Sequence, residues 1–279
     1  MKRIILPTDF SDNALNAARY ALKLFEDHEC TFYLINTYTP AIYQAEYVLH
    51  SPGQIGLGDI YQSESQEQLE KLQKQLQREF KNPKHTLITH SAFNILVDEV
   101  VSMTENEQAD FVIMGTQGAS GAKEIFLGTH TVHVIKKSRK PVLAIPAVYT
   151  FTAPTSILFP TDYEIDYQVE ELSVLLELAA MLGAKIHVLH IASGYGLTDN
   201  QKMNKSTLEQ ILAPLKSEFY EVPSQEVIEA INNFQKEHRV ELLAMVQNKH
   251  TFLERLFIEP VIKKIGFHVS IPFMVLPHQ

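Results

Sequence analysis

The chain has 279 residues, of which 45% are hydrophobic and 20% charged, with a formal net charge of -9 at pH 7. This length suits roughly two domains, and the acidic balance argues against a general nucleic-acid binder, which needs a basic face. The single cysteine, Cys30, allows no intrachain disulfide. No stretch has the ~18 uninterrupted apolar residues of a membrane span, and the three apolar residues before Pro7 are too few for a signal peptide. We therefore expect the protein to lie in the reducing cytoplasm.

Short apolar strands alternate with helical patterns through the first half of the chain. The first predicted helix follows Ser11 or Asp12, either of which is a suitable N-cap. Residues 39–62 show neither pattern and are expected to form an irregular connection. The predicted strands are 4–7, 31–37, 85–89, 110–114 and 141–145, and the later helices are 65–80, 95–104 and 131–137.

The second half repeats the first. Residues 4–10 read Ile-Ile-Leu-Pro-Thr-Asp-Phe, and residues 157–163 read Ile-Leu-Phe-Pro-Thr-Asp-Tyr. We therefore predict a tandem duplication, with domains at 1–148 and 153–279. The second set of strands is 157–160, 185–191, 219–222, 241–245 and 272–276, and Ser224 is expected to cap a helix. Strand and helix alternation predicts an α/β fold, with a doubly wound, mainly parallel five-stranded sheet in each copy.

A glycine-rich segment follows the fourth strand. Gly115, Gly118 and Gly128 are followed by Thr129 at the start of a helix. Glycine lets backbone N–H groups approach oxygen atoms, and a helix N-terminus adds partial positive charge, so this segment is typical of a phosphate site. Ligands in such folds lie at the carboxyl ends of strands, where Asp9 and Thr37 are also expected.

These motifs resemble the universal stress protein family in its two-domain form. The resemblance rests on the Pro-Thr-Asp-Phe-Ser segment at residues 7–11, the Gly-x2-Gly-x9-Gly-Thr spacing, and the closing strand at 140–145. It implies an adenine nucleotide alpha hydrolase-like, Rossmann-like fold. It also implies an ATP-binding role in stress response or signalling, with ADP or AMP as alternative ligands and Mg²⁺ as a bridge between phosphate oxygens.

The resemblance also implies roles for individual residues. The nucleoside would lie against Pro7, Thr8 and Asp9, the backbone at Asn36 and Thr37 would read the adenine edge, and Met114 would lie near the sugar. The phosphates would be held by Gly115, Thr116, Gly118, Gly128, Thr129 and the N–H of His130.

The second copy departs from this pattern where phosphate would bind. Val246, Lys249, Glu259 and Pro260 stand at the positions of Gly115, Gly118, Gly128 and Thr129. Side chains, a carboxylate and a missing N–H oppose phosphate binding, so we predict that this copy binds no ATP. We expect it to pair with the first copy as a pseudo-dimer through strands 141–145 and 272–276. Another anion at Lys249 and a homodimer of whole chains stay open.

No catalytic motif stands out. The chain has no Gly-x-Ser-x-Gly and no His-Glu-x-x-His, and His130 and His133 are expected on the surface or facing a ligand rather than on zinc. The sequence therefore favours a nucleotide-binding protein with unknown protein partners, and at most slow ATP hydrolysis. The alternatives are an interaction scaffold that binds no nucleotide, and a phosphotransferase or ATPase.

Overall fold

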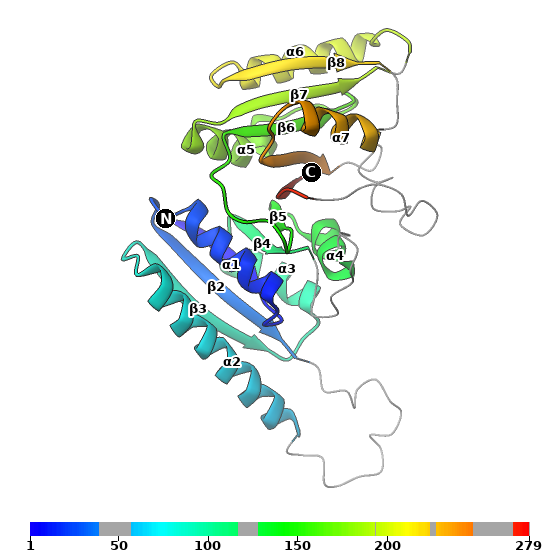
Figure 1. Ribbon diagram of the computed structural model, residues 1–279. Helices are drawn as coiled ribbons and strands as arrows, with labels where there is room; N and C mark the ends of the chain where they lie inside the picture. The colour runs from blue at the N-terminus through cyan, green and yellow to red at the C-terminus, as the bar shows by residue number, and fades with distance from the viewer. Residues whose placement is uncertain (39–56, 117–127, 193, 224–226, 248–269, 279) are drawn as a thin grey trace, which may run out of the picture. The chain divides into compact units, whose positions relative to one another are not determined.

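The computed structural model describes residues 1–38, 57–116, 128–192, 194–223, 227–247 and 270–278 (Figure 1). Among these residues, one compact unit ends at Ala147 and a second begins at Val148. The boundaries predicted for the two domains stay a prediction. Five residues discussed above lie outside the described part of the chain: Gly118, Ser224, Lys249, Glu259 and Pro260.

The first unit has a parallel sheet with strand order β3-β2-β1-β4-β5. The chain builds outward from β1 to β3 and then returns to the other side of β1. A topological switch point therefore lies between β1 and β4, as the predicted doubly wound fold requires. The strands are β1 (Lys2–Pro7), β2 (Cys30–Thr37), β3 (His85–Ala92), β4 (Phe111–Gly115) and β5 (Val142–Ile145), and the helices are α1 (Asp12–Leu24), α2 (Leu57–Phe80), α3 (Leu96–Asn106) and α4 (Thr129–Lys137).

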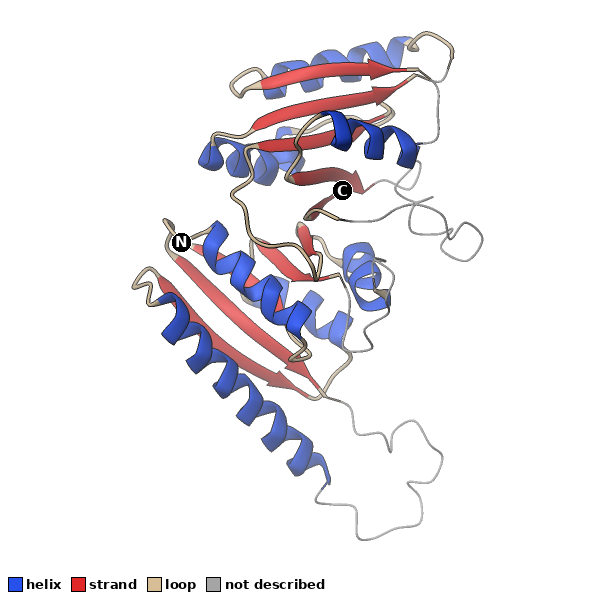
Figure 2. Cartoon of the chain, in the orientation of Figure 1, coloured by secondary structure: helices blue, strands red, loops and turns tan. Residues whose placement is uncertain are grey.

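Helices cover both faces of this sheet (Figure 2). α1 packs on β4 and β5 and α2 on β2 and β3, whereas α3 packs against α4 and β1. Right-handed crossovers explain this division, because the direction of travel across the sheet reverses at β4. The central strands are buried on both sides, and Cys30 lies in this core, where burial raises the pKa of its thiol to about 11.

The start of α2 corrects one sequence expectation. Residues 57–62 were predicted to be irregular, but the helix begins at Leu57. Ile60 on this added turn is 59% exposed. Residues 60–64 are all exposed and bury no apolar stripe, so the periodicity that marks an amphipathic helix begins only near Ser65.

The second unit repeats the topology, with strand order β10-β9-β6-β7-β8. Its strands are β6 (Ser156–Thr161), β7 (Lys185–Ile191), β8 (Ser217–Val222), β9 (Leu242–Gln247) and β10 (Phe273–Pro277), and its helices are α5 (Val169–Leu182), α6 (Asp199–Leu212) and α7 (Val227–Glu237). In both units the first strand pairs with the second and fourth, and the fourth pairs with the last. The predicted pair of five-stranded, mainly parallel sheets is confirmed.

A cluster of aromatic and ionisable side chains lies between β7, β8 and α7. The Nδ1 atom of His187 is 3.1 Å from the Tyr220 hydroxyl, which donates to Glu218, and Lys185 also bonds that carboxylate. The rings of Phe234 and His238 lie within 5.7 Å of the His187 ring centroid. Burial, together with Lys185 and His238, lowers the pKa of His187 below its ordinary value, and Glu218 opposes them.

We expect the second unit to lose stability when the pH falls below about 6.5, the ordinary value for histidine. The folded-state pKa of His187 is lowered, so its stabilising contribution is complete above the unfolded pKa and is lost as pH falls through the folded pKa. Thermal unfolding followed by circular dichroism at pH 7.5, 6.5 and 5.5 would measure this. His187→Phe keeps the aromatic packing and should show a smaller decrease; an equal decrease in both proteins would contradict the assignment to His187.

Candidate functional site

The turn after β1 is held by side-chain hydrogen bonds. The Thr8 hydroxyl accepts from the N–H of Phe10 at 3.0 Å, and the Asp9 carboxylate accepts from the N–H and hydroxyl of Ser11 at 3.1 and 2.6 Å. Phe10 has φ +63°, an unusual conformation for a bulky residue. Ser11 in turn accepts from the N–H of Ala14 and is the N-cap of α1. These bonds hold a strained turn at the carboxyl end of β1.

The second unit contains the same turn after β6. Thr161 accepts from the N–H of Tyr163 at 3.0 Å, Asp162 accepts from the N–H of Glu164 at 3.1 Å, and Tyr163 has φ +58°. The duplication therefore extends to individual hydrogen bonds and to one positive φ angle.

Thr37 directs its backbone toward the turn after β1. The N–H of Thr8 donates to the Ile35 carbonyl at 2.8 Å, and the N–H of Tyr38 donates to the Ala92 carbonyl at 3.0 Å. In a parallel strand, successive residues bond alternately to the two neighbouring strands. The Thr37 backbone therefore points to the β1 side, beyond the last bond between β1 and β2, whereas the Asn36 backbone points to β3.

The end of β4 meets the start of α4. The Gly115 carbonyl accepts from the Thr131 hydroxyl at 2.9 Å, and the N–H of Gly128 donates to the Thr116 carbonyl. Gly128 is the N-cap of α4 and offers no side-chain cap. The first amides of a helix have no intrahelical acceptor, so the N–H groups of Thr129 and His130, both exposed residues, are directed outward with the positive end of the helix dipole.

The two halves of the candidate site face each other across the switch point. β1 and β4 pair at Ile4–Phe111 and Ile5–Val112, and this pairing ends before either strand does. The turn at Asp9 and the junction of Gly115 with α4 therefore flank the place where the two strands stop pairing. This is the position at which open α/β sheets bind ligands.

Gly115 is glycine for a reason that needs no ligand. A Cβ atom added here would lie 2.5 Å from Nδ2 and 2.7 Å from Cγ of Asn13, a buried residue of α1. Both atoms belong to a short side chain held within the core, so an added methyl group would force a rearrangement.

We expect Gly115→Ala to destabilise the first unit by about 1–3 kcal/mol, the usual cost of overpacking. Asn13→Ala should remove the clash, so the double variant should be less destabilised than the sum of the single changes. Denaturant unfolding of the four proteins gives this coupling. Strict additivity would show that Asn13 is not what excludes a side chain at residue 115.

The corresponding region of the second unit is covered by its own side chains. Tyr163 is 2% exposed, whereas its counterpart Phe10 is 37% exposed. The Tyr163 ring stacks on His190 with centroids 4.8 Å apart, and the hydroxyl of the buried Tyr167 bonds that of Thr161. α1 begins three residues after Asp9, but α5 begins seven residues after Asp162. This longer turn supplies Tyr167.

The start of α6 closes the same turn from a second direction. Gln201 donates through Nε2 to the Asp162 carbonyl at 3.0 Å and to the Glu164 carboxylate at 2.8 Å, and Asn204 donates to the Tyr163 carbonyl at 2.9 Å. Burial raises the pKa of Asp162. The polar groups of this turn are therefore bonded to side chains of the second unit itself.

The comparisons with known proteins decide the family. A family model described as the universal stress protein family matches residues 1–146, which is more than half of the chain. The chain belongs to the universal stress protein family. Universal stress protein MJ0531 of Methanocaldococcus jannaschii is 30% identical over 153 residues, covering 52% of this chain and 81% of its own, and MJ0577 from the same organism is 32% identical over 154 residues, covering 52% and 94%.

A solved universal stress protein extends the likeness to both units. The structure from Archaeoglobus fulgidus covers 99% of this chain and 98% of its own, with a TM-score of 0.70 at 18% identity. At this identity the match concerns the fold. The resemblance that the sequence motifs indicated is thereby confirmed.

Most of the predicted site residues of this universal stress protein lie at the carboxyl edge of the first sheet. Pro7 ends β1, and Thr8 and Asp9 follow it. Asn36 and Thr37 end β2, Met114 and Gly115 end β4, and Thr116 follows β4. Gly128 is the N-cap of α4, which begins with Thr129 and His130. Gly118 lies outside the described residues. The nucleotide contacts of this set stay a prediction.

Asn13, Ser65, Ser91, Gln201 and Asn204 were not predicted to matter. Two of them had a signal in the sequence. Ser65 is a polar residue on the apolar stripe of α2, in line with Leu69, Leu72 and Leu76. Thr198 and Gln201 have the Thr-x-x-Gln spacing of a capping box, and the structure shows both of its hydrogen bonds at the start of α6.

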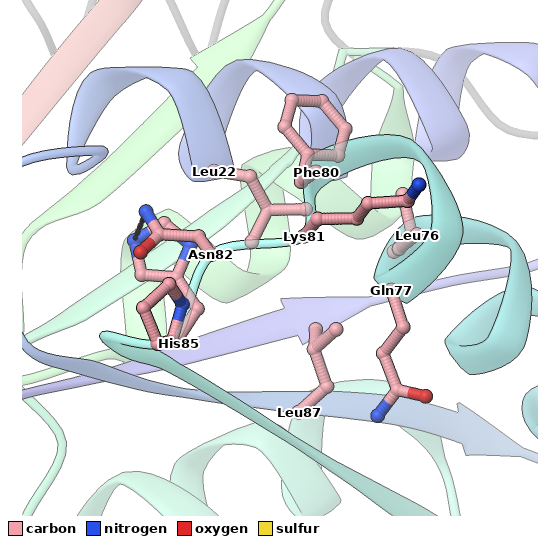
Figure 3. A pocket seen from close by; sticks show the side chains of 9 residues that line it. Leu22, Leu76, Gln77, Phe80, Lys81, Asn82, His85 and Leu87 are labelled. Atoms are coloured by element: carbon pink, nitrogen blue, oxygen red, sulfur yellow. Dashed lines mark hydrogen bonds between the residues drawn. The ribbon is translucent and has the colours of Figure 1, made fainter.

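A pocket of about 280 Å³ lies elsewhere in the first unit (Figure 3). Its walls come from the end of α2, the following turn and the start of β3, including Leu76, Phe80 and His85. It is therefore at the amino end of β3, and none of the predicted site residues lines it.

The described residues contain no group of three or more histidine, cysteine or acidic side chains arranged to hold a metal ion. Within the same residues, no helix is both long enough and apolar enough to cross a membrane.

Proposed function

We propose that the first unit binds an adenine nucleotide, with ATP as the preferred ligand, and that the protein acts in stress response or signalling through this bound nucleotide. The observation that carries the proposal is the N-terminus of α4, which begins without a side-chain cap beside the end of β4 at the switch point. Uncapped helix N-termini in this position favour phosphate. ADP and AMP are weaker alternatives because they offer this helix less negative charge.

The division of the ligand follows from the geometry. The triphosphate would lie against the N–H groups of Thr129 and His130, and the nucleoside would lie toward Asp9 and the Thr37 backbone. The hydroxyl of Thr116 is buried and has no hydrogen-bond partner among the residues that the structure describes, so it is a further candidate donor. Mg²⁺ would be held mainly by phosphate oxygens, because the glycine loop has no carboxylate pair that would serve as its ligands.

The second unit is proposed to bind no ATP and to act as a structural partner of the first, with possible further assembly of chains and unidentified protein partners. The support is the filled turn after β6, where Tyr163, Tyr167 and Gln201 occupy the space around Asp162. No catalytic motif stands out in the sequence, so we propose ATP hydrolysis that is slow or absent.

Isothermal titration calorimetry of the whole chain with ATP tests the proposal. We expect one site per chain, with weaker binding of ADP and AMP. No heat and no retention in equilibrium dialysis at millimolar ATP would overturn it and favour a scaffold that works without nucleotide. Steady phosphate release at several turnovers per second would instead identify an ATPase. Mass spectrometry of small molecules that copurify with the protein would show which nucleotide it carries.

A further inference from the structure

The side chain of Asn36 connects the ends of β1 and β2 to α2. Its Nδ2 donates to the Thr8 carbonyl at 2.8 Å, and its Oδ1 accepts from the Ser65 hydroxyl at 2.8 Å. Ser65 is buried and accepts from the Ser91 hydroxyl at 2.7 Å. The bonds run in one direction, from Ser91 through Ser65 and Asn36 to Thr8. Both ends of the Asn36 amide are therefore fixed, with its donor toward β1.

The last acceptor in this series of hydrogen bonds is the Thr8 carbonyl, which lies in the candidate site. The Thr8 carbonyl belongs to the same planar peptide group as the N–H of Asp9. The Thr8 N–H is bonded to Ile35, and its hydroxyl accepts from Phe10. With the carbonyl held by Asn36, every hydrogen-bonding group of Thr8 has a partner. The orientation of the peptide leading into Asp9 is thereby set.

The second unit makes the same bond with a different residue. His190 occupies the position of Asn36 in β7, and its Nδ1 lies 3.1 Å from the carbonyl oxygen of Thr161, the counterpart of Thr8. The side chains of asparagine and histidine differ in shape, but each can donate a hydrogen bond through an N–H group. The common requirement at this position is therefore a donor aimed at the carbonyl before the aspartate.

We infer that Asn36 is a positioning residue whose side chain orients the Thr8–Asp9 peptide toward the nucleoside, and that Ser65 and Ser91 hold its amide in the donating orientation. The inference rests on the proposed nucleotide site. It assigns the Asn36 side chain to the protein's own backbone and leaves recognition of the base to other groups, such as the Thr37 backbone.

Asn36→Leu, which removes the donor but keeps the branching of the side chain, tests the inference with adenosine and inorganic tripolyphosphate as separate calorimetric probes. We expect the variant to bind adenosine at least about tenfold more weakly, as for a lost hydrogen bond at a polar site. Its tripolyphosphate affinity should change by less than about twofold, because the phosphate amides belong to α4. Asn36→His should restore adenosine binding. Ser65→Ala, which keeps the donor but frees the amide, should give an intermediate loss and protects the test against misfolding of the first variant.

Three results would overturn the inference: unchanged adenosine affinity in folded Asn36→Leu, an equal decrease for both probes, or no rescue by histidine. Failure of the proposed function looks different, because the unmodified protein would then bind neither ATP nor either probe. Hydrogen exchange without nucleotide adds an independent readout. The amides of Phe10 and Ser11 should exchange faster in Asn36→Leu and return toward the unmodified rate in Asn36→His.

Discussion

Thr129→Pro should weaken ATP binding by tenfold or more while the protein stays folded. The change removes the N–H at the first position of α4, and a hydrogen bond to a charged group contributes about 1.5–3 kcal/mol, which corresponds to between roughly tenfold and a hundredfold in affinity. Proline is favoured at this helix position because the missing N–H has no intrahelical acceptor there. The residue before it is also compatible, since Gly128 has φ -62° and ψ 152°, the extended region that precedes proline.

Two further variants separate the amide from the hydroxyl. Thr129→Val keeps the N–H and removes only the hydroxyl, so it should lose a smaller part of the affinity, and Thr129→Ser should bind as the unmodified protein does. Calorimetric titration with ATP gives the affinities, and circular dichroism verifies the fold. If Thr129→Pro is folded and binds ATP normally, the phosphates do not lie at α4. The second half of the chain has Pro260 at the aligned position. The variant therefore gives the first unit the proline that the second half already has.

Glu241→Ala should cost the second unit about 1–3 kcal/mol for each buried donor that it leaves without an acceptor. One carboxylate oxygen of Glu241 accepts from the N–H and hydroxyl of Thr155 at 3.0 and 2.9 Å and from the N–H of Ser156 at 3.1 Å. The side chain of Glu241 is 7% exposed. Removing this side chain leaves these donors without an acceptor. The start of β6 should therefore separate from the start of β9.

Arg239→Ala is the matched control. Arg239 bonds the other oxygen of Glu241 at 3.1 Å but is 84% exposed, so its loss should change stability by less than about 1 kcal/mol. Because two units in one chain need not unfold together, hydrogen exchange of the β6 and β9 peptides is the better measurement. Unchanged protection of both peptides in Glu241→Ala would contradict the prediction.

The fold could be predicted because its central strands are buried on both faces and several strands end in recognisable residues. The Pro-Thr-Asp segments mark the ends of β1 and β6, and Gly115 marks the end of β4. The start of α2 could not be predicted, since residues 60–64 are exposed and show no apolar periodicity. α6 was not predicted, although the spacing of Thr198 and Gln201 is typical of a helix N-terminus.

The site was predictable as a set of strand ends and less so as a set of side chains. Sequence spacing places Asp9, Thr37 and Gly115 at one edge of a parallel sheet. It does not show that Asn13 fills the space above Gly115, or that Asn36 turns its amide toward Thr8, because both contacts depend on tertiary packing between residues far apart in the chain. The loss of ATP binding in the second unit was predicted only from the substitutions in its glycine loop. Tyr163 and Tyr167 add a closure at the nucleoside end that no spacing rule would have indicated.

The depth of Cys30 has a practical result. A thiol whose pKa is about 11 is ionised in only about one molecule in 10⁴ at neutral pH, and the thiolate is the species that alkylating reagents attack. If an exposed residue such as Phe10 were replaced by cysteine, a maleimide dye would therefore label the new cysteine and leave Cys30 unlabelled. That would turn the protein into a fluorescent reporter of events at the end of its first strand, with its natural cysteine left in place.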